Sequence, residues 1–129
     1  MPGKFILDTN IVIALFAEDK QVTSKIEKAR EIIVPAIVMG ELYYGARKSA
    51  RAIENLQHLD DFAVETCVMT VDTDTAREYG LVKNQLRAKG CPIPENDVWI
   101  AALARQHAIT LVSRDEHFNA VDDLDLVAW

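Results

Sequence analysis

The sequence predicts an α/β domain in which a parallel β-sheet of four to five strands is flanked by helices. Short apolar runs alternate along the chain with segments of helical periodicity. The stretches between successive apolar runs are long enough for the crossover connections that parallel neighbours require. No stretch has the composition of an interdomain linker, so we expect one domain over residues 1–129.

The first half of the chain is expected to hold two strands and four helices. Lys4–Leu7 is a short apolar strand that ends at Asp8, and residues 8–10 have the composition of a helix cap. The elements that follow are helices over residues 11–17 and 24–30, a strand over 32–34, and helices over 35–47 and 50–63. Pro35 is expected at the first helical position, where its missing N–H costs nothing.

The second half continues the alternation. A strand over residues 67–71 precedes a helix over 75–89, and Gly90 is a suitable residue to end that helix. A Pro-rich connector leads into a helix that opens at Pro94 or Glu95 and runs to about residue 107. Strands are expected over 109–112 and, at the edge of the sheet, over 124–127. Trp129 is expected to pack at the chain end.

Composition and charge narrow the classes of function. Half of the residues are apolar and 26% are charged, which is typical of a soluble globular domain. No apolar run approaches the ~20 residues of a membrane span. The first eight residues contain no signal-peptide pattern, so we expect a cytoplasmic protein. The net charge of −6 argues against a surface coated with positive charge but allows a local basic strip. Cys67 is expected in the core.

Four acids stand at the ends of apolar elements or inside them. Asp8 ends the first strand, Glu41 lies within an apolar helical stretch, and Asp115 follows a later strand. Asp97 begins an apolar helical face that continues three, four and seven residues later. Ligands bind beyond the carboxyl ends of parallel strands, and carboxylates gathered there resist ionising together unless a cation joins them. An all-oxygen site of this kind suits Mg²⁺ or Mn²⁺.

Each acid also has a simpler explanation. Asp8 could be a helix N-cap, and Glu41 could direct its carboxylate to solvent. Asp97 could be an acid that the helix dipole favours in a first turn, and Asp115 could be a turn residue. All four explanations have to hold at once, in this order and context, which makes the metal site the better interpretation.

Other polar residues are secondary candidates. Asn10 could orient Asp8 or cap its helix, and Ser113 could bind a phosphate or cap a turn. Arg114 and the basic segments 47–51 and 83–89 could contact phosphates. The three histidines lack the spacing of metal ligands and are interpreted as surface or packing residues: His58, His107 and His117.

The acids lie in four stretches that resemble the motifs of PIN-domain nucleases. These are Asp-Thr-Asn-Ile from Asp8, Val-Pro-Ala-Ile-Val-Met-Gly-Glu-Leu-Tyr-Tyr-Gly-Ala around Glu41, Asn-Asp-Val-Trp-Ile-Ala-Ala around Asp97, and Val-Ser-Arg-Asp-Glu-His-Phe around Asp115. The resemblance covers essentially the whole chain. Among PIN proteins, the short chain is most similar to VapC-type toxins of bacterial type II toxin–antitoxin pairs.

The resemblance implies an Mg²⁺- or Mn²⁺-dependent endoribonuclease with the PIN fold. The four acids would be its catalytic metal ligands, and Ser113 stands where the family usually has Thr or Ser. Water carried by the metal, rather than a side chain, would be the nucleophile. The resemblance further implies an RNA substrate, a homodimer and a cognate VapB-like antitoxin that covers the active site.

Three alternatives remain open on the sequence. The first is a PIN enzyme that processes RNA without a toxin role. The second is a haloacid-dehalogenase-like phosphatase or a response-regulator receiver. The phosphatase needs an Asp where Asn10 stands, and the receiver needs a Lys where Arg114 stands, so both fit poorly. The third is a PIN-like domain that binds RNA or a protein partner without catalysis.

Overall fold

The computed structural model of the chain describes residues 3–129. Met1 and Pro2, the start of the N-terminal stretch discussed above, lie outside the described residues. The strands are β1 (Lys4–Leu7), β2 (Glu31–Pro35), β3 (Cys67–Met69), β4 (Thr110–Val112) and β5 (Leu126–Val127). The helices are α1 (Thr9–Phe16), α2 (Lys20–Lys28), α3 (Ala36–Arg47), α4 (Ala52–Glu65), α5 (Thr73–Lys89), α6 (Glu95–His107) and the short 3₁₀ helix η1 (Glu116–Ala120).

The five strands form one sheet in the order β3-β2-β1-β4-β5, and every neighbouring pair is parallel. The predicted parallel α/β fold is therefore confirmed. The chain order reverses between β1 and β4, where Phe5 lies opposite both Ile32 and Thr110. In open parallel sheets a ligand crevice forms at such a reversal, beyond the carboxyl ends of the two strands.

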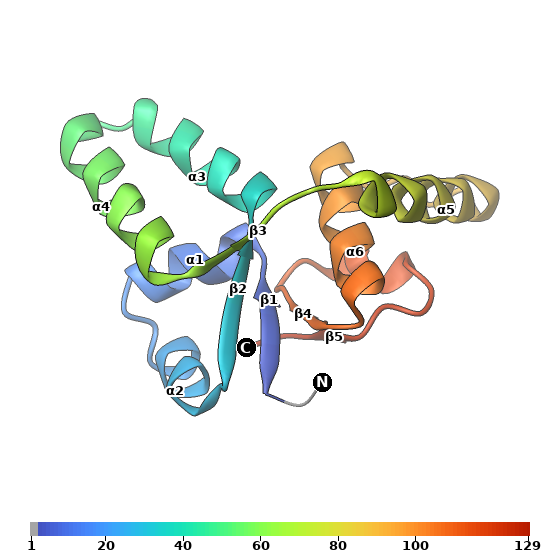
Figure 1. Cartoon of the computed structure of the whole chain (residues 1–129), viewed down its shortest axis with the longest axis horizontal. Coiled ribbons are helices and arrows are strands. Elements are labelled where there is room, and N and C mark those ends of the chain that lie inside the picture. The colour runs from blue at the N-terminus through green and yellow to red at the C-terminus, as the bar shows by residue number, and fades with distance from the viewer. Residues whose placement is uncertain (1–2) are drawn as a thin grey trace.

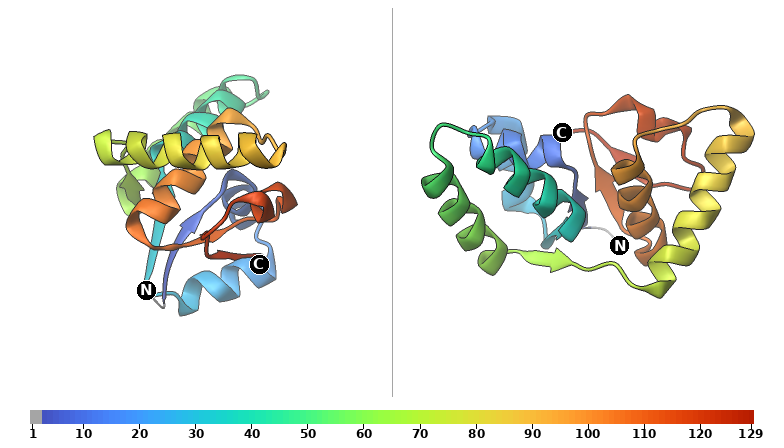
Figure 2. Two further views of the ribbon diagram at one scale, coloured as in Figure 1. Left: turned by 90° about the vertical axis from the view of Figure 1, so that its right-hand side faces the viewer. Right: turned by 90° about the horizontal axis from the view of Figure 1, so that it is seen from above.

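Helices cover both faces of the sheet. In Figure 1, α1 to α4 lie on the left of the strands and α5 and α6 on the right, and Figure 2 shows the same division from above. Right-handed crossovers explain this division, because the chain moves outward from β1 to β3 and then returns to the opposite side at β4. Ile6, Leu7, Leu111 and Val112 on the central strands are buried between the two layers.

Local chemistry defines the ends of several elements. Asp72 caps α5 with a reciprocal side-chain and backbone pair to Thr75, and Gly90 ends that helix in the left-handed region at a φ of 67°. Pro35 differs slightly from expectation. It is the last residue of β2, with extended backbone, and α3 begins at the next residue. Trp129 packs edge-on against Phe5 and is buried, as predicted.

The expectation that Cys67 is a core residue is wrong. Cys67 is exposed, because it opens β3 at the outer edge of the sheet.

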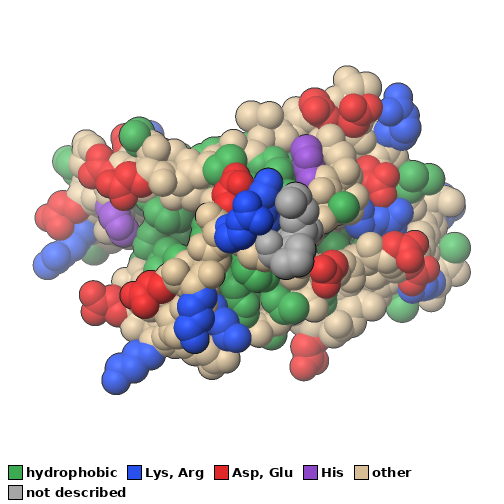
Figure 3. Space-filling model, turned by 60° about the horizontal axis from the view of Figure 1, so that its bottom comes forward, with side chains coloured by type: hydrophobic (Ala, Val, Ile, Leu, Met, Phe, Trp, Pro, Cys, Tyr) green, Lys and Arg blue, Asp and Glu red, His purple; other side chains and the backbone are tan. Residues whose placement is uncertain are grey.

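Over the face at the amino ends of the strands, acidic and basic side chains are interspersed, so this face carries no large patch of one charge (Figure 3). Within residues 3–129 no helix is long and apolar enough to cross a membrane.

Candidate metal centre

Asp8 lies at the centre of the carboxyl edge of the sheet. It follows β1 directly, and the residue is only 3% exposed. Oδ1 accepts a 2.8 Å hydrogen bond from the backbone N–H of Thr9, and Oδ2 accepts one of 2.7 Å from Ser113 Oγ. Burial raises the pKa of Asp8, while these two hydrogen bonds oppose the rise. Asp8 therefore caps α1 and also faces the crevice.

Asn10 and Ser113 join the loop after β1 to the loop after β4. Asn10 Nδ2 lies 3.3 Å from Asp8 Oδ2, 3.3 Å from Ser113 Oγ and 3.4 Å from Asp115 Oδ2. Ser113 is buried, and its Oγ also accepts a 3.0 Å bond from the backbone N–H of Asp115. These contacts bring the first and fourth acids to the same edge although more than a hundred residues separate them.

Glu41 approaches the crevice from α3. Its Oε2 accepts a 2.9 Å hydrogen bond from Thr9 Oγ1 at the start of α1. Its Oε1 lies 3.5 Å from Asn96 Nδ2, in the first turn of α6. The carboxylate is thus held from two neighbouring helices, which fixes its direction. The two hydrogen bonds favour the metal site over the simpler explanation in which the carboxylate is directed to solvent.

Asp97 is positioned by the first turn of α6, whose buried face contains Ile100, Ala101 and Ala104 as predicted. Its side chain is 13% exposed, and Oδ2 lies 2.7 Å from His117 Nε2. Burial, followed by the negative charge of Asp8, raises the pKa of Asp97 to about 6, and the imidazole of His117 offsets part of that rise. A carboxyl group in this state favours a cationic partner.

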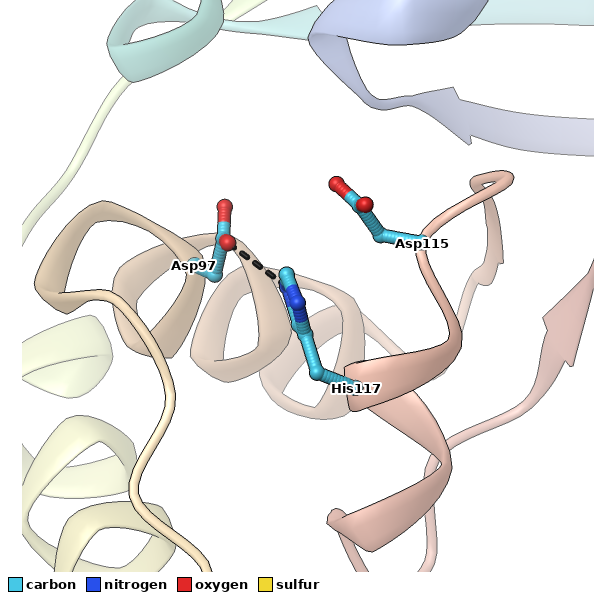
Figure 4. Close-up of side chains that lie close together, drawn as sticks. All are labelled: Asp97, Asp115 and His117. Atoms are coloured by element: carbon cyan, nitrogen blue, oxygen red, sulfur yellow. Dashed lines mark ion pairs between the residues drawn. The ribbon is translucent and has the colours of Figure 1, made fainter.

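His117 lies beside the predicted acids, a position that sequence analysis did not give it. Figure 4 shows Asp97 on α6 and Asp115 and His117 on the segment after β4, with the three side chains directed into one space. A ligand atom from each lies within 4.8 Å of the others. His117 does pack on the Phe118 ring, as the interpretation of a surface or packing residue allows, but it also lies beside two of the predicted acids. The only signal in the sequence was its position two residues after Asp115. That spacing brings the two side chains to one site because the segment between them leads into η1.

Arg114 is directed away from the acids. Its Nε donates a 2.7 Å hydrogen bond to the carbonyl of Trp129, and its Nη2 lies 3.1 Å from Asp19 Oδ2. Its backbone N–H donates to Asn10 Oδ1 over 3.2 Å. The guanidinium therefore joins the end of the chain to the loop before α2, and this geometry favours a positioning role over direct contact with a phosphate.

The four predicted acids form one electrostatic cluster. The charge of Asp115 raises the pKa of Asp8, and the charges of Asp8 and Glu41 both raise that of Asp97. Carboxylates that interact in this way resist ionising together, so a divalent cation would relieve the repulsion among them. The oxygen-rich donor set fits Mg²⁺ or Mn²⁺.

A groove of about 430 Å³ adjoins the cluster. It lies between α1 and the α3–α4 pair and opens beside Glu41. Its lining is mainly apolar and includes Thr9, Ile13, Phe16, Leu42, His58 and Leu59. The exposed Ile13 side chain adds apolar surface at this place.

Comparisons with known proteins agree with this arrangement. The family model described as PIN domain matches residues 5–124. Ribonuclease VapC2 of Haemophilus influenzae is 35% identical over 129 residues, with 98% of each chain covered. The crystal structure of VapBC2 from Rickettsia felis, bound to a DNA fragment from their promoter, contains a chain with a TM-score of 0.90, 29% identity and 98% coverage of both chains. VapBC-5 from Mycobacterium tuberculosis, a member of the VapBC family of toxin–antitoxin systems, matches with a TM-score of 0.77, 26% identity and the same coverage.

Proposed function

The chain belongs to the PIN-domain family and to its VapC ribonucleases, and from this premise we propose that it is a metal-dependent endoribonuclease, the toxin of a type II toxin–antitoxin pair. The observation that carries the proposal is the cluster of four acids at the carboxyl edge of the sheet: Asp8, Glu41, Asp97 and Asp115. One PIN domain over residues 1–129 would carry the activity.

In the proposed reaction the four carboxylates hold Mg²⁺ or Mn²⁺ and do not attack the RNA. When bound, the metal supplies an activated water and stabilises charge on the phosphoryl oxygen. Ser113 and the backbone N–H of Thr9 hold the Asp8 carboxylate, and Thr9 Oγ1 holds that of Glu41. Fixing these oxygens before RNA arrives lowers the cost of organising the transition state. Asn10 would position Asp8 and Asp115, and Arg114 would position the loop between them.

The C-terminal half of α3 is the best-supported path for RNA. Lys48 Nζ lies 4.4 Å from the centre of the Tyr44 ring, and Tyr44 is 65% exposed. An exposed aromatic ring can stack on a base, and the adjacent cation can contact a phosphate. Both residues lie within two helical turns of Glu41. Lys48 also belongs to the basic segment 47–51 that the sequence analysis singled out.

The proposal includes a protein partner and a second copy of the chain. A cognate VapB-like antitoxin would cover the crevice, and the apolar groove beside Glu41 offers it surface to bury. The chain would form a homodimer, and it would act on RNA in the cytoplasm. Growth arrest on expression, relieved by the product of a small neighbouring gene, is the expected cellular result. Cleavage without arrest would favour the alternative of an RNA-processing PIN enzyme.

The decisive test is cleavage of a panel of structured RNAs, tRNAs included, with Mg²⁺, with Mn²⁺ and with a chelator. Wild type should make discrete cuts with metal and none with chelator. Asp97→Asn should keep the fold and lose at least about 100-fold in rate, because it removes a charged metal ligand. Asp61→Asn is the matched control at an exposed residue of α4, and it should cleave like wild type. Equal cleavage by Asp97→Asn and wild type would contradict the assignment of Asp97. RNA binding without cleavage in any metal would favour the non-catalytic alternative.

A further inference from the structure

His117 places a ring nitrogen at the edge of the acid cluster. The Nε2 atom is shielded from solvent and makes no hydrogen bond of regular geometry among the described residues. It nevertheless lies 2.7 Å from Asp97 Oδ2, within the crevice. A buried polar atom without a well-aligned hydrogen-bond partner is costly. A bound cation that accepts the lone pair of this nitrogen would therefore be favoured.

The backbone around His117 fixes where its ring can go. The next residue, Phe118, is fully buried in the core and anchors η1. The two rings pack with their centres 4.8 Å apart. Because the turn is anchored and the imidazole rests on a buried ring, its direction toward Asp97 is preorganised (Figure 4).

The spacing of the donors is close to that of the ligands of one ion. Neighbouring ligands of an octahedral ion with bonds of about 2.1 Å lie about 3 Å apart, and opposite ligands lie about 4.2 Å apart. Asp97 and His117 have the separation of neighbours, and all three donors, with that of Asp115, lie within 4.8 Å. These residues come from two elements that meet only in the folded chain.

We propose that His117 donates Nε2 to the metal and that this nitrogen makes the centre prefer Mn²⁺ to Mg²⁺. The inference rests on the metal dependence of the proposed function. Mg²⁺ strongly prefers oxygen ligands, whereas imidazole suits the transition metals better. Carboxylates alone would not make the site selective for Mn²⁺ over Mg²⁺ in this way. The pattern of acids leaves both metals open, and His117 determines which of the two is preferred.

The test uses pulsed electron paramagnetic resonance of the 129-residue chain loaded with Mn²⁺. Wild type should show nitrogen modulation from a directly bound imidazole, and His117→Gln should lose it. His58→Gln is the matched control, because His58 packs on Phe16 beside the groove and takes no part in the cluster. It should keep the modulation. Circular dichroism should be the same for all three proteins.

Calorimetric titration completes the test. His117→Gln should weaken Mn²⁺ binding by at least about tenfold, a loss typical when a metal site is disturbed, and should change Mg²⁺ binding much less. Wild type that binds Mn²⁺ without nitrogen modulation would overturn the role of His117 and leave the ribonuclease proposal intact. Wild type that binds neither ion would overturn both. An equal loss for both ions would contradict the proposed preference.

Discussion

At the scale of single residues, Asp97 shows how the fold changes the chemistry of one carboxyl group. Its pKa rises from 3.8 to about 6, first because α6 buries it and second because Asp8 lies nearby. Between these two values the folded chain holds a proton that the unfolded chain has released. In the absence of metal, the contribution of Asp97 to the stability of the folded state therefore falls as the pH rises from about 4 to about 6.

The first prediction follows from that pKa. In a chelator, Asp97→Asn should have a higher Tm than wild type at about pH 7.5, because the amide carries no charge to bury. The difference should shrink as the pH falls through about 6, where the wild-type carboxyl takes up its proton. Scanning calorimetry of both proteins between about pH 4 and 8 measures this difference in Tm. An advantage that is the same at both ends of this range would show that the charge of Asp97 is not its cause.

At the scale of elements, α3 joins the acid cluster to the exposed Tyr44 and Lys48. Positions 41, 44 and 48 lie on one side of the helix, and Lys48 stands about 10 Å beyond Glu41 at about 1.5 Å of rise per residue. Several other cations are paired with carboxylates, such as Lys83 with Glu95 and Arg105 with Glu78. No ion pair engages Lys48 among the residues that the structure describes, so its charge is available.

The second prediction concerns this helix. Lys48→Ala should raise the KM for RNA by about 3- to 10-fold and leave kcat nearly unchanged, because it removes a phosphate contact outside the acid cluster. The dependence of log KM on log salt should become shallower by about one. Lys28→Ala, on α2, is the control. A fall in kcat at constant KM would instead place Lys48 in the organisation of the acids.

At the scale of the whole molecule, the centre is built from parts that are far apart in sequence. Its acids come from the end of β1, from α3, from α6 and from the loop after β4. A cation held by all four would join the layers on both faces of the sheet. Unfolding would separate these ligands, so metal binding should stabilise the chain as a unit.

The third prediction is therefore a rise in Tm with metal. At about ten times Kd the stabilisation is about 1.4 kcal/mol, which corresponds to roughly 5 °C for a chain of this size. Mn²⁺ and Mg²⁺ titrations followed by differential scanning fluorimetry measure it. Asp8→Asn should lose most of the shift, and Asp61→Asn should keep it. An absent shift at millimolar concentrations of both ions would contradict a preformed centre.

The alternation of strands and helices, several of the helix caps and the four acids with their family motifs could all be predicted from the amino-acid sequence. These features are local, since periodicity and capping depend on neighbours along the chain. Tertiary structure alone decided that Thr9 holds Glu41, that Arg114 turns toward Trp129, and that His117 faces Asp97. Such contacts join residues 15 to 32 positions apart, and strand order and helix packing set their distances. No local pattern encodes those distances, and for that reason the position of His117 beside the acids became visible only in the folded chain.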